Sequence, residues 1–188
     1  SPPTIPPALA AEFNRSVHEG FPGFEGIVSV SSVSLGYPGA SELALDSVTL
    51  DIPSSQSVAL VGSTGAGKST LADVILGVLL PDSGSVLISG VQPFESVQRW
   101  PGAMAYVPQD VAVLTGSVRE NVALGIPSEF IDNSLVWEAL ERAHLAEFLR
   151  SSRDGIETLV GENGVQLSGG QRQRLGIARA LYSRPRLL

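Results

Sequence analysis

Alternating apolar and polar residues mark two stretches in the first third of the chain. Between residues 28 and 37 the apolar positions recur every second residue, with one slip after Val30. This is the pattern of a strand with one buried face and a β-bulge. Residues 48–52 alternate in the same way after the turn sequence YPGAS. We therefore expect two strands that pair with each other.

Three shorter apolar runs complete the predicted strands. The run SVALV, residues 57–61, ends at a glycine and is typical of a strand buried on both faces of a parallel sheet. SVLISG at residues 85–90 and AMAYV at residues 103–107 are two further strand candidates.

Helical spacing of apolar residues appears in two places. The first follows a glycine-rich stretch and predicts a helix from about Lys68 to Gly77 or Pro81. The second starts at Leu135 and predicts a helix that extends to Leu149.

Two capping boxes indicate where further helices begin. Ser117 and Glu120 have the S-x-x-E spacing in front of VRENVAL, and Ser168 and Gln171 have the related S-x-x-Q spacing. In such a box each side chain bonds the other residue's backbone N–H. The helix after Ser168 should end before Pro185.

The first 26 residues differ from the rest, because prolines interrupt them and the sequence FPGFEG ends them. These prolines are Pro2, Pro3, Pro6, Pro7 and Pro22. We expect residues 1–26 to be a linker without regular structure, and residues 27–188 to form the folded domain. Strands followed by helices predict a mixed α/β domain with a helical insertion at about residues 110–165.

Composition and charge narrow the function classes. The net charge of −7 argues against nucleic acid as the main partner. All 19 acidic residues lie in residues 1–168, whereas residues 169–188 carry five arginines and no acid. That basic segment suits either a nucleic-acid patch or one face of a helix, and we favour the helix. The absence of cysteine excludes disulfides and thiolate metal sites. His18 and His144 have no metal-ligand spacing.

The stretch VGSTGAGKST carries the strongest chemical signal. It contains Gly62-x-x-x-x-Gly67-Lys68-Ser69, and Lys68 is the single lysine of the chain. In a phosphate-binding P-loop the lysine contacts the β- and γ-phosphates, the serine hydroxyl holds Mg²⁺, and Thr70 adds an α-phosphate contact. The residues between the glycines that line such a loop are Ser63, Thr64, Gly65 and Ala66. The alternative is an ordinary glycine-rich turn between a strand and a helix.

A second candidate phosphate site lies in LSGGQRQRLGIARAL, residues 167–181. Two glycines in the first turn of a helix allow close backbone approach, and the bare N–H groups of that turn attract anions. The alternative is an ordinary capped helix.

Together these motifs resemble the nucleotide-binding domain of ATP-binding cassette proteins. LSGGQ follows the P-loop by about a hundred residues, as the signature motif does in that family. Tyr37 corresponds to the aromatic residue that stacks on adenine, and Gln109 in YVPQD to the Q-loop glutamine. LTGSVRENVALG, and TLVGENG at residues 158–164, resemble exporter segments around the signature.

The resemblance implies a P-loop NTPase cassette with an antiparallel β subdomain and a mostly parallel core sheet. It implies ATP and Mg²⁺ as cofactors, with Lys68 and Gln109 acting in turnover and Ser69 and Gln109 near the metal. Two such domains pair head to tail in the family. The signature residues, which would face the partner's ATP, are Ser168, Gly169, Gly170 and Gln171.

The resemblance also implies a transmembrane domain as partner, no nucleic acid, and a place on the cytoplasmic face of a membrane, with the bacterial inner membrane expected. Residues 1–26 would connect to that membrane domain. The function that the resemblance implies is an ATPase that drives export of a cargo across a membrane. The alternatives are a soluble cassette ATPase acting on ribosomes or DNA, and a regulatory nucleotide-binding module.

In the family, the Walker B strand, a D-loop and a switch histidine come after the position of Leu188. We therefore expect the 188-residue chain by itself to bind nucleotide weakly and not to turn it over.

Overall fold

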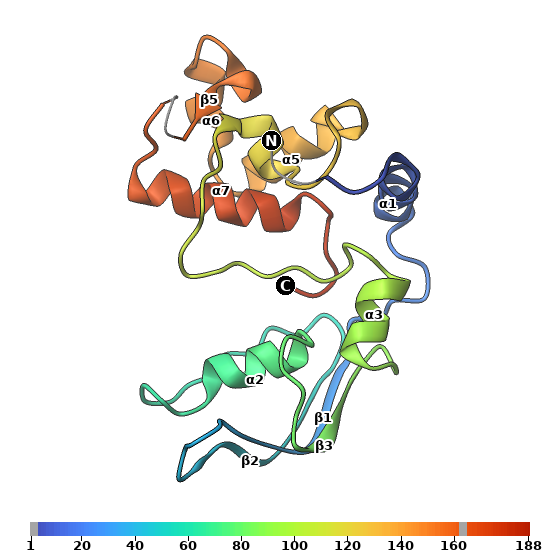
Figure 1. Ribbon diagram of the computed structural model, residues 1–188. Helices are drawn as coiled ribbons and strands as arrows, with labels where there is room; N and C mark the ends of the chain where they lie inside the picture. Colours follow the sequence, from blue (N-terminus) through green and yellow to red (C-terminus); the bar gives the residue numbers. More distant parts are fainter. Residues whose placement is uncertain (1–3, 162–164) are drawn as a thin grey trace. The chain divides into compact units, whose positions relative to one another are not determined.

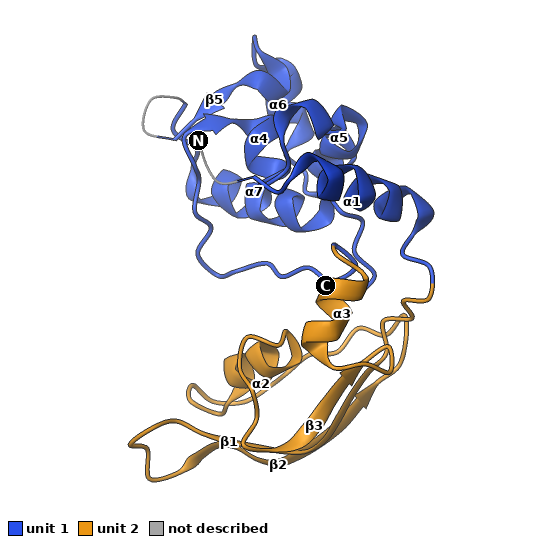
Figure 2. Ribbon diagram, turned by 45° about the vertical axis from the view of Figure 1, so that its right-hand side comes forward, with its two compact units in different colours: residues 1–22, 102–188 blue, residues 23–101 orange. Residues whose placement is uncertain are grey.

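The computed structural model describes residues 4–161 and 165–188, and these form two compact units. Unit 2 comprises residues 23–101, and unit 1 comprises residues 4–22 together with 102–188 (Figure 2). Each unit is described by itself below. In the described parts of the chain, no helix combines the length and apolar character that a membrane span requires.

Unit 2 contains a three-stranded antiparallel sheet in the order β2-β1-β3. Two helices, α2 and α3, both contact β3 (Figure 1). Its elements are β1 (Val28–Gly36), β2 (Leu43–Ile52), α2 (Lys68–Ile75), β3 (Ser83–Ile88) and α3 (Pro93–Arg99). The antiparallel β subdomain expected from the sequence is therefore present.

The bulge predicted in the first strand is also present. The pairing of β1 with β2 shifts register between Val30 and Val33, and Ser32 between them has a φ of 48°. The shift keeps Val30, Val33 and Leu35 all buried. The apolar residues before and after the bulge thus face the same core.

The strand predicted at residues 57–61 is not observed. This segment pairs with no strand among the residues that the structure describes, and Val58 and Val61 are 55% and 93% exposed. An apolar run records a preference for burial, but a strand forms only where a neighbouring strand can accept its hydrogen bonds. SVALV finds no such neighbour in the described residues.

The run at residues 103–107 differs from its prediction in a similar way. Met104 forms a single parallel bridge with Leu187, supported by the hydrogen bond from Ala105 N to Leu187 O at 3.0 Å. Parallel pairing in the described residues is limited to this bridge and the one between Val160 and Val165. The mostly parallel core sheet is not seen in these residues.

Unit 1 is mainly helical, with α4 and α5 packed on α7. Its elements are α1 (Pro7–Glu19), β4 (Gly116–Ser117), α4 (Val118–Val122), η1 (Ser128–Phe130), α5 (Asn133–Arg142), α6 (Ala146–Ser151), η2 (Gly155–Glu157), β5 (Leu159–Val160) and α7 (Gly169–Leu181). Both predicted capping boxes form, at Ser117 with Glu120 and at Ser168 with Gln171.

The single helix predicted from Leu135 to Leu149 is in fact two helices, α5 and α6. His144 between them has a φ of 56°, which a continuing helix does not allow. The turn at His144 redirects the chain so that Leu145 and Ala146 are both buried. Apolar spacing alone did not reveal this break, because both helices bury residues in the same core.

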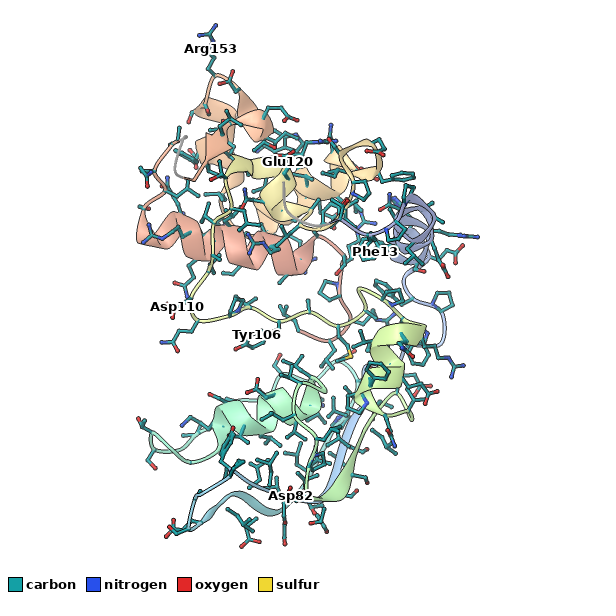
Figure 3. The ribbon with its side chains drawn as sticks, in the orientation of Figure 1. Phe13, Asp82, Tyr106, Asp110, Glu120 and Arg153 are labelled. Atoms are coloured by element: carbon teal, nitrogen blue, oxygen red, sulfur yellow. The ribbon has the colours of Figure 1, made fainter. Side chains whose placement is uncertain are left out.

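The prediction of an irregular leader was wrong, because α1 occupies Pro7–Glu19. Its prolines stand at the N-terminal boundary, where a missing N–H costs nothing, and Gly20 ends it with a φ of 70°. Ala10 and Val17 are buried. Phe13 projects toward the C-terminal end of α7 (Figure 3) and stacks on Tyr182 with ring centroids 6.4 Å apart.

Polar contacts also attach α1 to the region before α5. Asn14 Nδ2 donates to Phe130 O at 2.7 Å, and His18 Nε2 lies 3.1 Å from Asp132 Oδ2. The leader helix is therefore an integral part of unit 1.

The basic segment at residues 169–188 behaves as one helix and its continuation, as favoured from the sequence. Each of its five arginines bonds within unit 1: Arg172 to Leu167 O, Arg174 to His144 O, Arg179 to Ala112 O and Asn121, Arg184 to Glu138, and Arg186 to Gly20 O. Guanidinium groups so engaged stabilise the protein's own fold, and this weakens the nucleic-acid interpretation.

Asp132 caps α5 and contacts His18 of α1, and its substitution tests both interactions. Its carboxylate accepts from the Ser134 side chain and from the backbone N–H groups of Ser134 and Leu135, and it contacts His18. These hydrogen bonds, the Ser134 side chain foremost, lower the pKa of Asp132 below the ordinary 3.8. We expect Asp132→Ala to reduce the free energy of unfolding by about 1 kcal/mol at pH 7. Asp132→Asn should cost less, because asparagine caps helices equally well.

The pH dependence of this effect follows from the lowered pKa. A group with a lowered folded pKa contributes fully above its unfolded value, and the contribution is lost as the pH falls through the folded one. Urea unfolding between pH 7 and 3 should therefore show the difference between wild type and Asp132→Ala narrowing below the ordinary value of 3.8. A difference that stays constant over this range would contradict a role for the carboxylate charge.

Candidate nucleotide-binding site

The glycine-rich loop enters α2 through two left-handed residues. Gly65 and Gly67 have φ values of 86° and 81°, which residues other than glycine adopt only with strain. A Cβ at Gly67 would lie 2.3 Å from the carbonyl oxygen of Ala44. The loop therefore runs against the backbone of β2 at this residue, and glycine is required there for two independent reasons.

The start of α2, like those of α1, α3 and α6, lacks the side-chain cap that three other helices have. Within the described residues no side chain caps α2, whereas Ser117, Asp132 and Ser168 cap α4, α5 and α7. The N-terminal N–H groups of a helix need acceptors, and together they carry a partial positive charge. An anion of the size of a phosphate can satisfy them.

Lys68 places the single ammonium group of the chain at the same helix start. Its Nζ donates to the carbonyl oxygens of Gly62 at 2.9 Å and Ser63 at 2.7 Å. These bonds fold the loop around the ammonium and use two of its three donors. No described residue accepts from the third donor, so it can point at a bound oxygen, and the loop and its lysine are arranged for a phosphate.

Three other predicted residues cluster with the loop. Tyr37 follows β1 and is 46% exposed, and its hydroxyl lies 3.1 Å from Oγ1 of the buried Thr70. Ser69, predicted to hold Mg²⁺, is exposed in the first turn of α2. Ser63, Thr64 and Ala66 are exposed as well. The structure thus gathers the predicted aromatic residue and the predicted phosphate residues in unit 2.

The remaining predicted residues lie in unit 1. Gln109 and Asp110 line a shallow pocket of about 190 Å³ next to the start of α7, with Val111, Gly169, Arg172 and Gln173. Gln109 and the signature helix are therefore brought together, while the P-loop belongs to the other unit.

The start of α7 is built differently from that of α2. Ser168 Oγ accepts from Gln171 N at 3.2 Å, and Gln171 Oε1 accepts from Ser168 N at 2.8 Å. A hydroxyl that accepts one bond keeps its own proton for another acceptor. A Cβ at Gly170 would meet no described atom within 4 Å. The chain's own packing thus leaves this helix start open.

The described residues contain no group of three or more acidic, histidine or cysteine side chains that could hold a metal ion. Any Mg²⁺ would have to be held by hydroxyl, amide and phosphate oxygens, which is common for this ion when it binds with a nucleotide. Glu162, Asn163 and Gly164 of the exporter-like segment TLVGENG lie outside the described residues.

Sequence reasoning missed three residues that hold this region together. Asn121 is buried in α4, and Arg179 and Gly176 lie on α7 facing the segment after Gln109. Burial lowers the pKa of Arg179 from its ordinary value. The only available signal was a glycine three residues before an arginine in the apolar second half of the helix predicted after Ser168.

The loop, its lysine and the uncapped helix start define a P-loop domain for phosphate-bearing ligands. A family model described as "ABC transporter" matches residues 45–188, well over half of the chain, and the chain belongs to that family. Membership implies that this domain binds a nucleotide.

Curated relatives are longer proteins. The chain is 39% identical over 165 residues to an ATP-dependent lipid A-core flippase of Thiobacillus denitrificans, which covers 87% of the chain and 28% of the flippase. It is 36% identical over 176 residues to the leukotoxin export ATP-binding protein LtxB of Aggregatibacter actinomycetemcomitans, over 93% of the chain and 25% of that protein. The chain thus spans about a quarter of these relatives.

A solved structure has a similar fold. A bacterial Atm1-family ABC exporter with ATP bound superposes with a TM-score of 0.75 at 31% identity, covering 86% of this chain and 28% of that one. The cassette fold expected from the sequence is therefore shown.

The close approach of Gly67 to β2 leads to a matched pair of substitutions. Gly65→Ala should cost roughly 1 kcal/mol, because no described atom lies within 4 Å and only the left-handed conformation is strained. Gly67→Ala should cost roughly 3 kcal/mol or more, since the same strain is combined with a collision against the Ala44 carbonyl. Urea unfolding measures both, and equal costs would contradict the close approach.

Proposed function

We propose that this chain is the nucleotide-binding part of a membrane exporter, in which ATP binding and hydrolysis drive a cargo across the membrane. The observation that carries the proposal is the uncapped start of α2 with Lys68 folded into its loop. The two curated relatives described above support the export role, because their names describe a flippase and an export protein.

The residues around the loop have distinct roles in this proposal. Lys68 and the backbone N–H groups of the α2 start bind the β- and γ-phosphates, and Tyr37 stacks on the adenine. Ser69 would hold Mg²⁺, which neutralises charge on the phosphates when bound, and Gln109 would act in turnover. The hydrogen bond between Tyr37 and Thr70 supports this assignment, because it holds the ring next to the helix that follows the loop.

A second nucleotide-binding domain completes the site in a head-to-tail dimer. Ser168, Gly169, Gly170 and Gln171 would face the γ-phosphate of the partner's ATP. The room beside Gly170 and the unused proton of Ser168 favour this arrangement. Neither feature has a role in the packing of unit 1 itself.

Residues 1–26 connect the cassette to a transmembrane domain, which places the cassette on the cytoplasmic face of a membrane. The attachment of α1 to unit 1 is consistent with such a connection, because a docked helix transmits displacement better than a flexible linker. The bacterial inner membrane is our proposal for the location, supported by the bacterial relatives.

The cargo is not selected by the cassette in this proposal. The flippase is named for lipid A-core and LtxB for a leukotoxin, yet both match the chain at similar identity. Residues that bind nucleotide can therefore be shared between exporters of unlike cargo. A soluble role on ribosomes or DNA is not favoured, because these relatives are exporters and the arginines of residues 169–188 bond within unit 1.

Lys68→Ala tests nucleotide binding by the P-loop. Mg-ATP at a hundred times its Kd should stabilise the wild-type chain by about 2.7 kcal/mol, a rise in Tm of about 5–10 °C in a thermal-shift titration. Lys68→Ala should abolish the rise, because the loop loses its ammonium. Arg153→Ala removes the same charge from an exposed position and should keep the rise. A rise that survives Lys68→Ala would refute the proposed site.

Tyr37 tests the adenine end of the site. Tyr37→Ala should weaken ATP binding by about fivefold or more, the loss expected for one base–aromatic stack. Tyr37→Phe loses the Thr70 hydrogen bond but keeps the ring, so its ATP affinity should stay near that of wild type. The affinity for inorganic tripolyphosphate, measured by competition, should be unchanged in both variants. An unchanged ATP affinity in Tyr37→Ala would contradict the stacking of Tyr37 on adenine.

A further inference from the structure

The segment that follows Gln109 is attached to α7 by a close steric contact. A Cβ at Gly176 would lie 2.3 Å from Cγ2 and 3.0 Å from Cγ1 of Val111. Gly176 is helical and is not in a left-handed conformation, so its backbone does not require glycine. The missing side chain instead lets Val111 pack directly on the helix.

Arg179 attaches the same segment one turn further along α7. Its Nη2 donates to the carbonyl oxygen of Ala112 at 3.0 Å, and its Nε donates to the carbonyl oxygen of Asn121 at 2.9 Å. One planar guanidinium therefore bridges the segment and the end of α4. A lysine at this position has a single nitrogen and cannot make both bonds with the same geometry.

Asn121 completes the attachment from α4. Its Nδ2 donates to Leu114 O at 2.8 Å and Ser117 O at 3.0 Å. Its Oδ1 accepts from Leu114 N at 2.9 Å and from Arg179 Nη2 at 3.3 Å. The side chain is 1% exposed and uses two donors and two acceptor positions, which is the full capacity of an amide.

We propose that Gly176 and Arg179 of α7, together with Asn121 of α4, are positioning residues for Gln109. They hold residues 111–114 against the signature helix, in the region of Asp110 (Figure 3). Gln109 and the signature residues Ser168–Gln171 are then carried on one rigid body. This inference rests on the proposed function for its consequence in turnover.

The attachment couples the movement of the signature helix α7 to the movement of Gln109. In the proposed dimer, the start of α7 meets the partner's nucleotide, whereas Gln109 acts in the turnover of ATP. A displacement of α7 therefore carries Gln109 with it, because Val111 and Ala112 are fixed to the helix. Weakening the attachment should uncouple these movements and lower turnover without weakening nucleotide binding by the P-loop.

The first experiment measures the attachment in the nucleotide-free chain by amide hydrogen exchange. Arg179→Lys should speed exchange in residues 110–116 by about tenfold or more, as expected for loss of a charged hydrogen bond. The amide of Leu114 is the most direct reporter. Arg174→Lys is the matched control, since Arg174 lies on the same helix and, among the described residues, bonds His144 O alone. It should leave the segment unchanged.

The outcomes of this exchange experiment are distinct. Faster exchange confined to residues 110–116 supports the proposal. Equal acceleration in α5 would indicate a general loss of stability and would overturn it, as would unchanged exchange in the segment. A failure of ATP binding in the Lys68 titration would refute the proposed function and leave this result unaffected.

The second experiment uses a steric rescue in the complete exporter. Gly176→Ala should lower kcat by about tenfold or more, with KM for ATP changed less than about twofold, because the added methyl displaces Val111. Adding Val111→Ala removes both methyl groups that collide and should restore kcat to within about threefold of wild type. A double variant that is slower than Gly176→Ala alone, or a loss that appears in KM, would overturn the proposal.

Discussion

The contact between Gly67 and the carbonyl of Ala44 is the constraint on which the phosphate site depends. It fixes where the chain leaves the loop and where α2 begins, because the backbone can pass β2 only at a residue without a side chain. The direction of α2 then determines where its free N–H groups point. The loop, lysine and helix thus act together because one close approach sets the position of all three.

The two helix starts that carry the candidate chemistry solve the same electrostatic problem differently. The α2 start has no side-chain cap among the described residues, so an external acceptor can bond its N–H groups, while α7 is capped by its own serine and glutamine. An uncapped start gains most from a bound anion, whereas a capped one keeps its shape without it. This difference suits a primary phosphate site on α2 and a preformed contact surface on α7.

Local signals in the sequence were sufficient for elements stabilised by neighbouring residues. The bulged hairpin, both capping boxes and the start of α2 follow from alternation or from spacings of a few residues. The irregular conformation of residues 57–61 and the break at His144 did not follow, since they depend on partners distant in sequence or on the direction of the next helix. The leader helix was missed because prolines at a helix boundary resemble prolines in a linker.

The candidate site shows the same division. Every candidate residue of the glycine-rich loop could be named from the sequence, because phosphate binding requires glycines, a lysine and a hydroxyl at fixed spacing. The attachment of Val111 and Ala112 to α7 could not be predicted from the sequence, because an arginine or asparagine within a helix is ordinarily exposed. Only the burial of Asn121 and the missing side chain of Gly176 distinguish these residues. Residues that contact a ligand leave a chemical pattern, whereas residues that transmit its effect are defined by what they touch.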